Sequence, residues 1–200
     1  MKKEFNIAVG ADGRGSTFEA IVDATKRGEI KGRVVLLFSN NPDCLAVKKA
    51  RSLKIPVLIL DPNKSKEERN ETLCRVLNSY FAKIDLVCLA GYLKLIPQCL
   101  IGAFPKRIIN SHPALDLVRF GGKGMYGSHV TKAVIEAGLK ETGSSIHYVT
   151  EMYDDPLGII AQTEPILILP DDTPESLLAR QLPSEQKLYL EVIKKLSEGS

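Results

Sequence analysis

The run Asn110-Ser111-His112-Pro113 contains the residue types best suited to chemistry in this sequence. It follows residues 107–109, a predicted short strand, and we expect it to be a loop at the carboxyl end of that strand, where open α/β sheets bind ligands. The Asn110 amide and the His112 imidazole can both point at one developing oxyanion. The alternative is a structural turn. Because the chain has only three His, a His directly before Pro113 is less expected to be a residue without a function.

A second polar segment could supply a carboxylate to this imidazole. His147 lies in the alternating run 145–149, a predicted strand, and Asp154 and Asp155 follow in a loop ended by Pro and Gly. A carboxylate beside an imidazole favours the protonated ring and can orient a water. The alternatives are an ordinary turn at the two Asp and a His147 that packs beneath a site without reacting. There is no His-x-x-x-His spacing and His129 has no evident partner, so we expect no metal site.

The segment Gly13-Arg14-Gly15-Ser16-Thr17 lies between the first predicted strand and the first predicted helix. Backbone amides and the positive end of the helix dipole converge there, which suits a phosphate. It is neither a dinucleotide fingerprint nor a Walker A loop, because Phe18 replaces the third glycine and no Gly-Lys-Ser/Thr follows. A tight turn without a ligand is the alternative. We also expect Ser16 and Glu19 to form a capping box on that helix.

Residues 121–127 form a second glycine-rich segment. No predicted strand precedes it and no helix start follows at once, so we expect a mobile flap over the site.

The cysteines form no Cys-x-x-Cys pair, and Cys88 lies in an apolar run where a thiol acts as a small hydrophobe. We expect all of them, Cys44, Cys74, Cys88 and Cys99, to be reduced and structural.

Short apolar runs alternate with segments of helical periodicity, which is typical of buried parallel strands separated by helices. The predicted strands span residues 6–9, 34–38, 57–60, 86–89, 107–109, 145–149 and 162–169. The predicted helices follow residue 16 and cover residues 44–53, 65–80 and 174–196. No Ser/Gly linker divides the chain, so we expect one α/β domain over residues 1–200, with a Rossmann-like, mostly parallel sheet flanked by helices.

Composition bounds the possible partners. The chain has 200 residues, 44% of them hydrophobic and 26% charged, which is enough for a core without a disulfide or structural metal. The net charge of +3 is too mild to indicate nucleic acid, and the charged run 64–69 is expected to be a solvated helix face. No run approaches the roughly 18 apolar residues of a membrane span, and residues 2–4 lead into a strand rather than a signal sequence. We therefore expect a cytoplasmic protein without membrane or nucleic-acid partners.

Taken in order, these segments resemble one family, phosphoribosylglycinamide formyltransferase, also called glycinamide ribonucleotide transformylase, of de novo purine (IMP) synthesis. The resemblance covers nearly the whole chain, and the ordered set of motifs is specific although each motif alone is not. The segments that carry it are residues 13–17, 38–40, 89–96, 107–115, 120–127 and 143–149, together with Asp154 and Glu185.

The resemblance implies transfer of a formyl group from 10-formyltetrahydrofolate to the amine of glycinamide ribonucleotide, without a metal. The catalytic residues it implies are His112, Asn110 and Asp154: Asn110 and a protonated His112 would stabilise the oxyanion, and Asp154 would keep His112 cationic and help move a proton. The implied contacts of the ribonucleotide are Gly15, Ser16, Thr17 and Glu185. The implied contacts of the folate are Lys66, Leu93, Lys94, Leu95, Ile96 and Asn110, with residues 149–154. These small molecules are the expected partners of a monomer or homodimer.

The loop after Tyr153 is one residue longer than the family pattern. Counting forward from His147 selects Asp154 as the catalytic carboxylate, whereas counting back from residues 159–160 selects Asp155. We prefer Asp154, which keeps the family's spacing from the preceding strand.

Three other positions also depart from the family pattern. Residues 116–119, Asp-Leu-Val-Arg, replace the usual Leu-Pro-Lys continuation and add a residue, so this loop can take a different course. Ser111 replaces the usual Ile. Asp12 stands where a small residue is common, and its charge would weaken phosphate binding.

Other functions of the same fold are less favoured. Methionyl-tRNA formyltransferase would need a basic extension, and a formyltetrahydrofolate hydrolase would need an amino-terminal regulatory domain; we expect neither in 200 residues. A non-catalytic folate- or ribonucleotide-binding relative is suggested by the altered loops 116–119 and 154–158. Against it, Asn110, His112 and an Asp at a suitable spacing are all present.

Overall fold

Strands and helices alternate in the computed structural model, which describes residues 4–80 and 83–199. The strands are β1 (Phe5–Gly10), β2 (Gly32–Ser39), β3 (Val57–Ile59), β4 (Leu86–Leu89), β5 (Ile108–His112), β6 (Glu141–Thr142), β7 (Ser145–Tyr148), β8 (Ile159–Gln162) and β9 (Ile166–Leu167). The helices are α1 (Ser16–Lys26), α2 (Leu45–Ser52), α3 (Lys66–Asn78), α4 (Gln98–Ala103), α5 (Leu117–Phe120), α6 (Ser128–Glu136), the 3₁₀ helix η1 (Pro156–Gly158) and α7 (Pro174–Glu198).

The larger sheet has the strand order β3-β2-β1-β4-β5-β7-β8, and β6 pairs with β9 separately. β1 runs parallel to β2 and β4, and β2 runs parallel to β3, whereas β7 and β8 are antiparallel. The predicted α/β fold with a mostly parallel sheet is therefore confirmed. By compactness the chain divides within β5 into one unit of residues Met1–Ile109 and Ile193–Ser200 and a second of Asn110–Val192.

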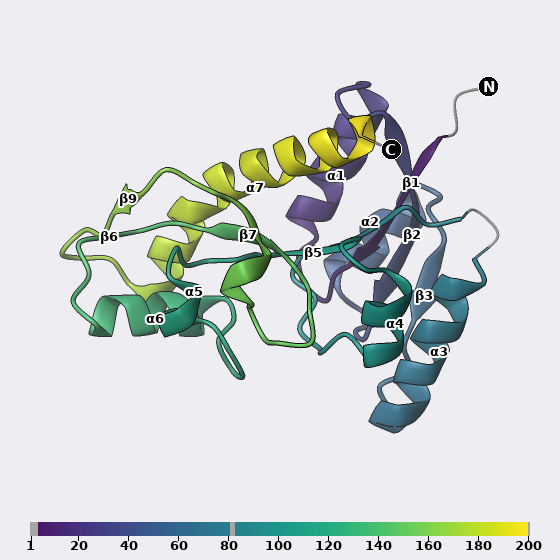
Figure 1. The fold of residues 1–200 in the computed structure, drawn as a ribbon, viewed down its shortest axis with the longest axis horizontal. Helices are drawn as coiled ribbons and strands as arrows, with labels where there is room; N and C mark the ends of the chain where they lie inside the picture. The colour runs from purple at the N-terminus through teal and green to yellow at the C-terminus, as the bar shows by residue number, and fades with distance from the viewer. Residues whose placement is uncertain (1–3, 81–82, 200) are drawn as a thin grey trace. The chain divides into compact units, whose positions relative to one another are not determined.

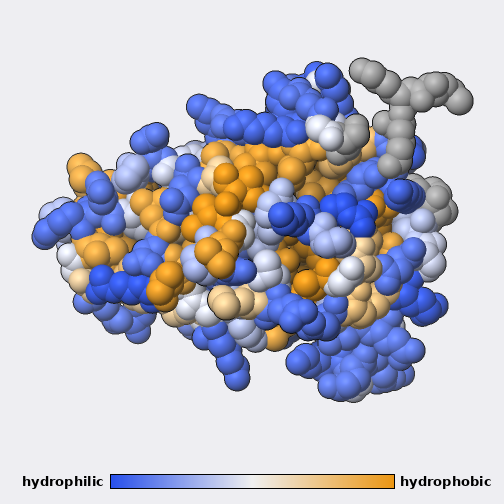
Figure 2. Space-filling view, in the orientation of Figure 1, coloured by the Kyte–Doolittle hydropathy of each residue, from blue (hydrophilic) through white to orange (hydrophobic). Residues whose placement is uncertain are grey.

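In the first unit, helices α1 to α4 are arranged about strands β1 to β4 (Figure 1). Every residue of β1 is buried, as expected of a parallel strand covered on both faces. Helix α1 buries Phe18, Ile21 and Val22 on one side, which agrees with its apolar periodicity. Figure 2 shows a strongly hydrophilic surface over α3, at the lower right of the view, so the charged run 64–69 is the solvated face that its sequence predicts.

The predicted capping box at Ser16 and Glu19 is wrong. The N-cap of α1 is Gly15, which has the left-handed φ of 69° and makes no side-chain cap. Its lack of a side chain is required, because a Cβ there would lie 2.7 Å from the Cα of Ala46. Glu19 instead forms an ion pair with Lys49, at 2.7 Å. A capping box does occur at the start of α3, formed by Ser65 and Glu68.

In the second unit, α5 and α6 contribute Phe120, Val130 and Val134 to a buried cluster with Ala114. Helix α6 begins at Ser128, directly after the glycine-rich segment 121–127, so the expectation that no helix start follows that segment is wrong.

The single strand predicted over residues 162–169 is also wrong. The segment is divided between the end of β8 and the short strand β9. Pro165 lies between them, and because proline has no N–H to donate, it interrupts a strand ladder. Thr163, directly after β8, still bonds to Ser144: its amide donates to the Ser144 carbonyl and its hydroxyl accepts from the Ser144 amide, each at 2.9 Å.

Strand β5 extends further than its apolar residues indicate. Asn110, Ser111 and His112 were expected in a loop after the strand, but they form its last three residues. Their side-chain directions are therefore set by the pleat of a strand and not by a turn.

The expectation that all cysteines are reduced is wrong for two of them. Cys74 of α3 and Cys99 of α4 form a disulfide, with their Cα atoms 6.2 Å apart. They are 25 residues apart in sequence, so only the packing of the two helices brings them together. Cys44 and Cys88 are buried and take no part in a disulfide.

Within the described residues, no helix combines the length and apolarity needed to cross a bilayer.

Candidate active site

Strand β5 divides its polar side chains between two sides. Successive side chains of a strand point to opposite faces, so Asn110 and His112 share one side and Ser111 takes the other. The contacts agree with this division: the amide nitrogen of Asn110 lies 3.3 Å from Nε2 of His147, whereas Ser111 donates to Glu185 at 2.9 Å. The structure therefore brings Asn110 and His112 to the same side of β5.

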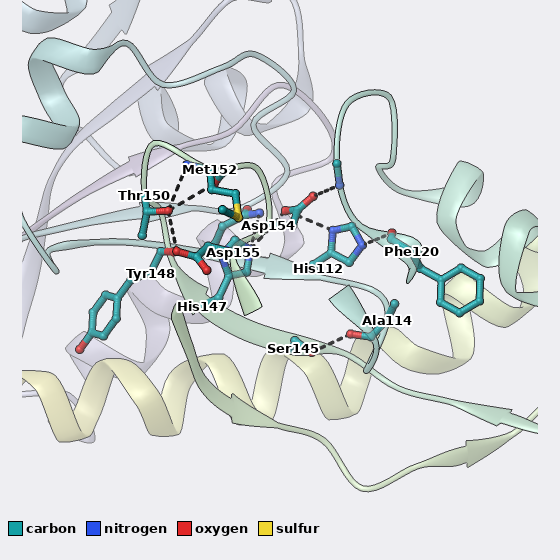
Figure 3. A network of polar contacts seen from close by, with 12 residues as sticks. His112, Ala114, Phe120, Ser145, His147, Tyr148, Thr150, Met152, Asp154 and Asp155 are labelled. Atoms are coloured by element: carbon teal, nitrogen blue, oxygen red, sulfur yellow. Dashed lines mark hydrogen bonds and ion pairs between the residues drawn. The ribbon is translucent and has the colours of Figure 1, made fainter. Parts of the chain in front are cut away.

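Asp154 lies at the centre of a cluster on that side (Figure 3). Its Oδ1 lies 3.5 Å from Nδ1 of His112 and 3.4 Å from Nε2 of His147. Its Oδ2 accepts a hydrogen bond from the amide of Gly122, at 2.8 Å. Asp154 also has a φ of 42°, a left-handed conformation that is uncommon for a residue with a side chain and that concentrates at functional sites.

The hydrogen-bond partners of the two imidazoles indicate which ring nitrogens carry a proton. Nε2 of His112 lies 2.8 Å from the carbonyl oxygen of Phe120, which can only accept, so Nε2 carries a proton. Nδ1 of His112 faces the Asp154 carboxylate, and a second proton there makes the ring a cation beside an anion. His147 differs: its Nδ1 donates to the carbonyl of Tyr148 at 3.1 Å, and its Nε2 faces both the amide nitrogen of Asn110, at 3.3 Å, and Oδ1 of Asp154, at 3.4 Å. Both imidazoles therefore present a ring nitrogen to the same carboxylate.

Asp154 is ionised in this environment. Burial acts to raise the pKa of its carboxyl group, but hydrogen bonds from His112 and His147, the charge of His112 and the Gly122 amide outweigh burial. The net effect holds the pKa of Asp154 well below its usual range. A permanent negative charge is thus placed next to His112.

Asp155, the alternative carboxylate, makes different contacts. Its Oδ2 accepts from the hydroxyl of Thr150 at 2.9 Å, and its Oδ1 accepts from the amide of Leu157 at 2.9 Å, which caps η1. Figure 3 shows both carboxylates in one view, with the dashed lines to imidazole drawn from Asp154. Of the two candidates, Asp154 is the one that contacts His112.

The phosphate-binding candidates lie in the first unit, at the start of α1. The helix begins at Ser16 and has 11 residues, so its positive dipole end lies at Gly15, Ser16 and Thr17. The loop is held by its backbone, because the carbonyl of Gly13 accepts from the amide of Ala46 at 3.1 Å. Both features suit an anion.

Asp12 has a role that the sequence does not reveal. Its Oδ1 accepts from the hydroxyl of Ser39 at 2.9 Å and the amide of Asn40 at 2.7 Å, and its Oδ2 accepts from the amide of Leu93 at 3.0 Å. This carboxylate therefore connects the segments that follow β1, β2 and β4. From the sequence alone Asp12 is only a charge beside the phosphate loop.

The folate candidates of the first unit are mostly exposed. Leu93 and Leu95 are 56% and 48% exposed, which is unusual for leucine. Lys94 and Lys66 are also exposed, while Ile96 is half-buried. Exposed leucines suit the face of a flat ring system, and exposed lysines suit an anionic group.

Two backbone groups of the second unit were not identified from the sequence: the carbonyl of Phe120 and the amide of Gly122, which contact His112 and Asp154. The glycine-rich segment 121–127 drew attention to this region as a flap. It did not identify the two groups, because every residue type except proline has the same backbone donor and acceptor. Within residues 4–80 and 83–199, no group of three or more His, Cys, Asp or Glu is arranged to hold a metal.

The chain is similar to known proteins over most of its length. Residues 5–193 match the sequence profile of the family described as formyl transferase. The chain is 46% identical over 197 residues to the chloroplastic phosphoribosylglycinamide formyltransferase of Arabidopsis thaliana, covering 96% of this chain and 65% of that protein. The chain thus spans about two thirds of the length of this plant relative.

A bacterial relative and a solved structure match over more of their own length. The phosphoribosylglycinamide formyltransferase of Haemophilus influenzae is 33% identical, covering 100% of this chain and 89% of that protein. The crystal structure of glycinamide ribonucleotide transformylase 1 from Symbiobacterium toebii superposes with a TM-score of 0.88 at 34% identity, covering 100% of this chain and 90% of that one.

Proposed function

Because this chain belongs to the formyl transferase family, we propose that it transfers the formyl group of 10-formyltetrahydrofolate to the amine of glycinamide ribonucleotide, a step of de novo purine synthesis. The names of the relatives from Arabidopsis and Haemophilus state formyl transfer to phosphoribosylglycinamide, which is glycinamide ribonucleotide, and so support this acceptor. The observation that carries the proposal is the contact between His112 and Asp154, beside Asn110, on one side of β5.

The reaction joins the amine nitrogen to the formyl carbon and breaks the bond from that carbon to N10 of the folate. Attack by the amine first forms a tetrahedral oxyanion. Asn110 and cationic His112 stabilise that negative charge, and a preorganised donor of this kind contributes about 3 to 4 kcal/mol. His112 must then exchange its contact with the Phe120 carbonyl for one with the oxyanion.

Asp154 keeps His112 cationic and assists the proton transfer. The attacking amine loses a proton and the departing folate nitrogen gains one, so the proton balance of the reaction is neutral. A carboxylate of lowered pKa beside the imidazole favours the charged ring throughout. Holding the two substrates together lowers the barrier further by proximity.

In this proposal Gly15, Ser16 and Thr17 bind the phosphate of the ribonucleotide, and Glu185 also contacts it. The folate binds along the exposed residues 93–96, with Asn110 close to its formyl group and Lys66 near its anionic tail. The reaction uses no metal. We further infer that residues 1–200 act as one formyltransferase domain in the cytoplasm, as a monomer or homodimer.

The test is an activity assay with both substrates. Mixing the protein with 10-formyltetrahydrofolate and glycinamide ribonucleotide should change the folate absorbance, and His112→Ala should remove at least 99% of that rate. The matched control is His129→Ala, because His129 is exposed and stacks on Tyr126; it should retain the wild-type rate.

Other outcomes would identify the alternatives. Release of formate without the ribonucleotide would indicate a hydrolase. Tight folate binding without transfer to any amine would indicate a non-catalytic relative, and turnover unaffected by His112→Ala would exclude the proposed mechanism.

A further inference from the structure

The carboxylate of Glu185, a half-buried residue of α7, is held by two hydroxyl groups. Ser111 donates to Oε1 at 2.9 Å, and Ser144 donates to Oε2 at 3.0 Å. Among the described residues no Lys or Arg forms an ion pair with Glu185. A carboxylate partly withdrawn from water without a paired Lys or Arg is costly to keep, so the two hydroxyls are its main compensation within the second unit.

Both donors are fixed by their own surroundings. Ser111 belongs to β5, and its direction follows from the alternation that places Asn110 and His112 on the other side. Ser144 is fully buried and exchanges two hydrogen bonds with Thr163: its amide donates to the Thr163 hydroxyl and its carbonyl accepts from the Thr163 amide, each at 2.9 Å. Two rigid donors define one orientation of the carboxylate.

The helix that carries Glu185 is fixed against the same two segments. Gln181, one turn earlier in α7, donates to the carbonyl of Gly143 at 2.7 Å and to that of Pro113 at 3.3 Å. Residues four apart lie on the same helix face. Gln181 therefore donates to backbone carbonyls of the segments that contain Ser111 and Ser144, while Glu185 accepts hydrogen bonds from their serine hydroxyls.

We propose that Ser111 is a positioning residue: with Ser144 it holds the Glu185 carboxylate in one orientation, and this sets the affinity for the ribonucleotide. This inference rests on the proposed function, in which Glu185 contacts that substrate. Each oxygen of the carboxylate accepts one serine hydroxyl and keeps capacity for a further donor from the ligand. Ser111 itself does not act on the formyl group.

Charge supports the same role. Burial raises the pKa of Glu185, whereas the hydroxyls of Ser111 and Ser144 and the nearby His112 act to lower it. Removal of the Ser111 hydroxyl should therefore raise the pKa further. The ionised carboxylate, which accepts hydrogen bonds, would then be lost at a higher pH than in the wild-type protein.

The test compares Ser111→Ala, Ser111→Thr and Ser144→Ala with the wild-type protein. Ser111→Ala should raise the KM for glycinamide ribonucleotide about tenfold, which is a typical effect of a hydrogen bond to a charged group, and should change kcat less than twofold. Ser144→Ala should act in the same direction. Ser111→Thr keeps the hydroxyl and should restore the KM to within about threefold.

The matched control is Ser176→Ala, which also removes a serine donor to a carboxylate, that of Asp172 at 2.8 Å, but on an exposed part of α7. It should leave the KM unchanged. As the pH is lowered, the KM for the ribonucleotide should begin to rise at a higher pH in Ser111→Ala than in the wild-type protein. A purely structural effect would lower the melting temperature without moving this pH profile.

Calorimetric titration with the ribonucleotide alone separates this inference from the proposed function. If the wild-type protein binds the ribonucleotide but transfers no formyl group, the function fails, and weaker binding by Ser111→Ala still supports the positioning role. If transfer occurs and Ser111→Ala changes kcat alone, or leaves KM and affinity within twofold, the positioning role is wrong. Absence of ribonucleotide binding to the wild-type protein overturns both.

Discussion

At the scale of single residues, two neighbouring carboxylates have different tasks. Asp154 contacts both His112 and His147, whereas Asp155 accepts hydrogen bonds from Thr150 and Leu157 within its own loop. The sequence does not reveal this difference, because the two residues are adjacent and either could reach the imidazoles from the loop that follows β7. Asp154 is also the one of the two with a left-handed backbone, at a φ of 42°.

Replacing each carboxylate by its amide tests this assignment. Asp154→Asn should lower kcat about a hundredfold or more, because the amide removes the negative charge that favours cationic His112. Asp155→Asn should lower kcat less than fivefold. Steady-state kinetics of both variants provides the comparison, and an equal loss in the two would mean that Asp154 has no special role.

The stability of the protein should also depend on Asp154 in a definite pH range. Its folded-state pKa is lowered from the ordinary value, so its contribution is complete above the unfolded-state pKa of about 4 and is lost as the pH falls below it. The difference in unfolding free energy between the wild-type protein and Asp154→Asn should thus be undiminished between roughly pH 5 and pH 6 and shrink below pH 4. Urea titrations at several pH values measure it; a difference that grows in acid would contradict the assignment.

At the scale of elements, the altered loop 116–119 has become part of the site's framework. Its residues form most of the one-turn helix α5, which Asp116 caps by accepting from the amide of Arg119 at 3.0 Å. The end of α5 places the Phe120 carbonyl at His112 and the Gly122 amide at Asp154. The departure from the family pattern therefore leaves a connected cluster in the second unit.

Gly121, between these two backbone contacts, should not tolerate a side chain. A Cβ there would lie 2.8 Å from the Cβ of Asp154 and would also clash with the carbonyl oxygen of Leu117. Gly121→Ala should therefore displace Asp154 and lower kcat about tenfold or more. Gly102→Ala in α4 is the control, because a Cβ at that position meets nothing within 4 Å. Kinetics that are the same for both variants would show that Gly121 is not a close-approach site.

At the scale of the whole molecule, the disulfide restricts the unfolded chain. Cys74 and Cys99 close a loop of 25 residues, and loop-closure entropy assigns such a cross-link about 3 to 4 kcal/mol of stability. Composition predicts a core sufficient for folding without it, so the reduced protein should be less stable but still folded.

Urea denaturation with and without a reductant measures this contribution. The reductant should lower the unfolding free energy of the wild-type protein by about 3 kcal/mol and should leave a Cys74→Ser/Cys99→Ser double variant unchanged. Thiol titration of the denatured, unreduced protein should detect two thiols, those of Cys44 and Cys88. Detection of four thiols would show that the bond is absent.

The sequence by itself determined the strands β1 to β4 and the helices α1 to α3 that alternate with them, whereas the short helices α4, α5 and α6 were not predicted. Apolar runs of four or five residues predicted β1 to β4, because a strand buried on both faces is apolar nearly throughout. The ordered motifs resembled one family, and that resemblance selected Asn110, His112 and Asp154 from the candidates that residue type and spacing had left open. Both kinds of signal are carried by side chains that follow one another in the chain.

Tertiary structure alone decided which distant groups meet. Periodicity says nothing about whether Cys74 reaches Cys99 or whether Ser111 faces Glu185, because those contacts depend on how helices pack and on strand direction. Backbone groups such as the Gly122 amide are the same in every residue type, so no sequence pattern marks them. Which of Asp154 and Asp155 contacts His112 depends on the course of their loop, which the sequence does not specify; in the structure it is Asp154, whose φ is 42°.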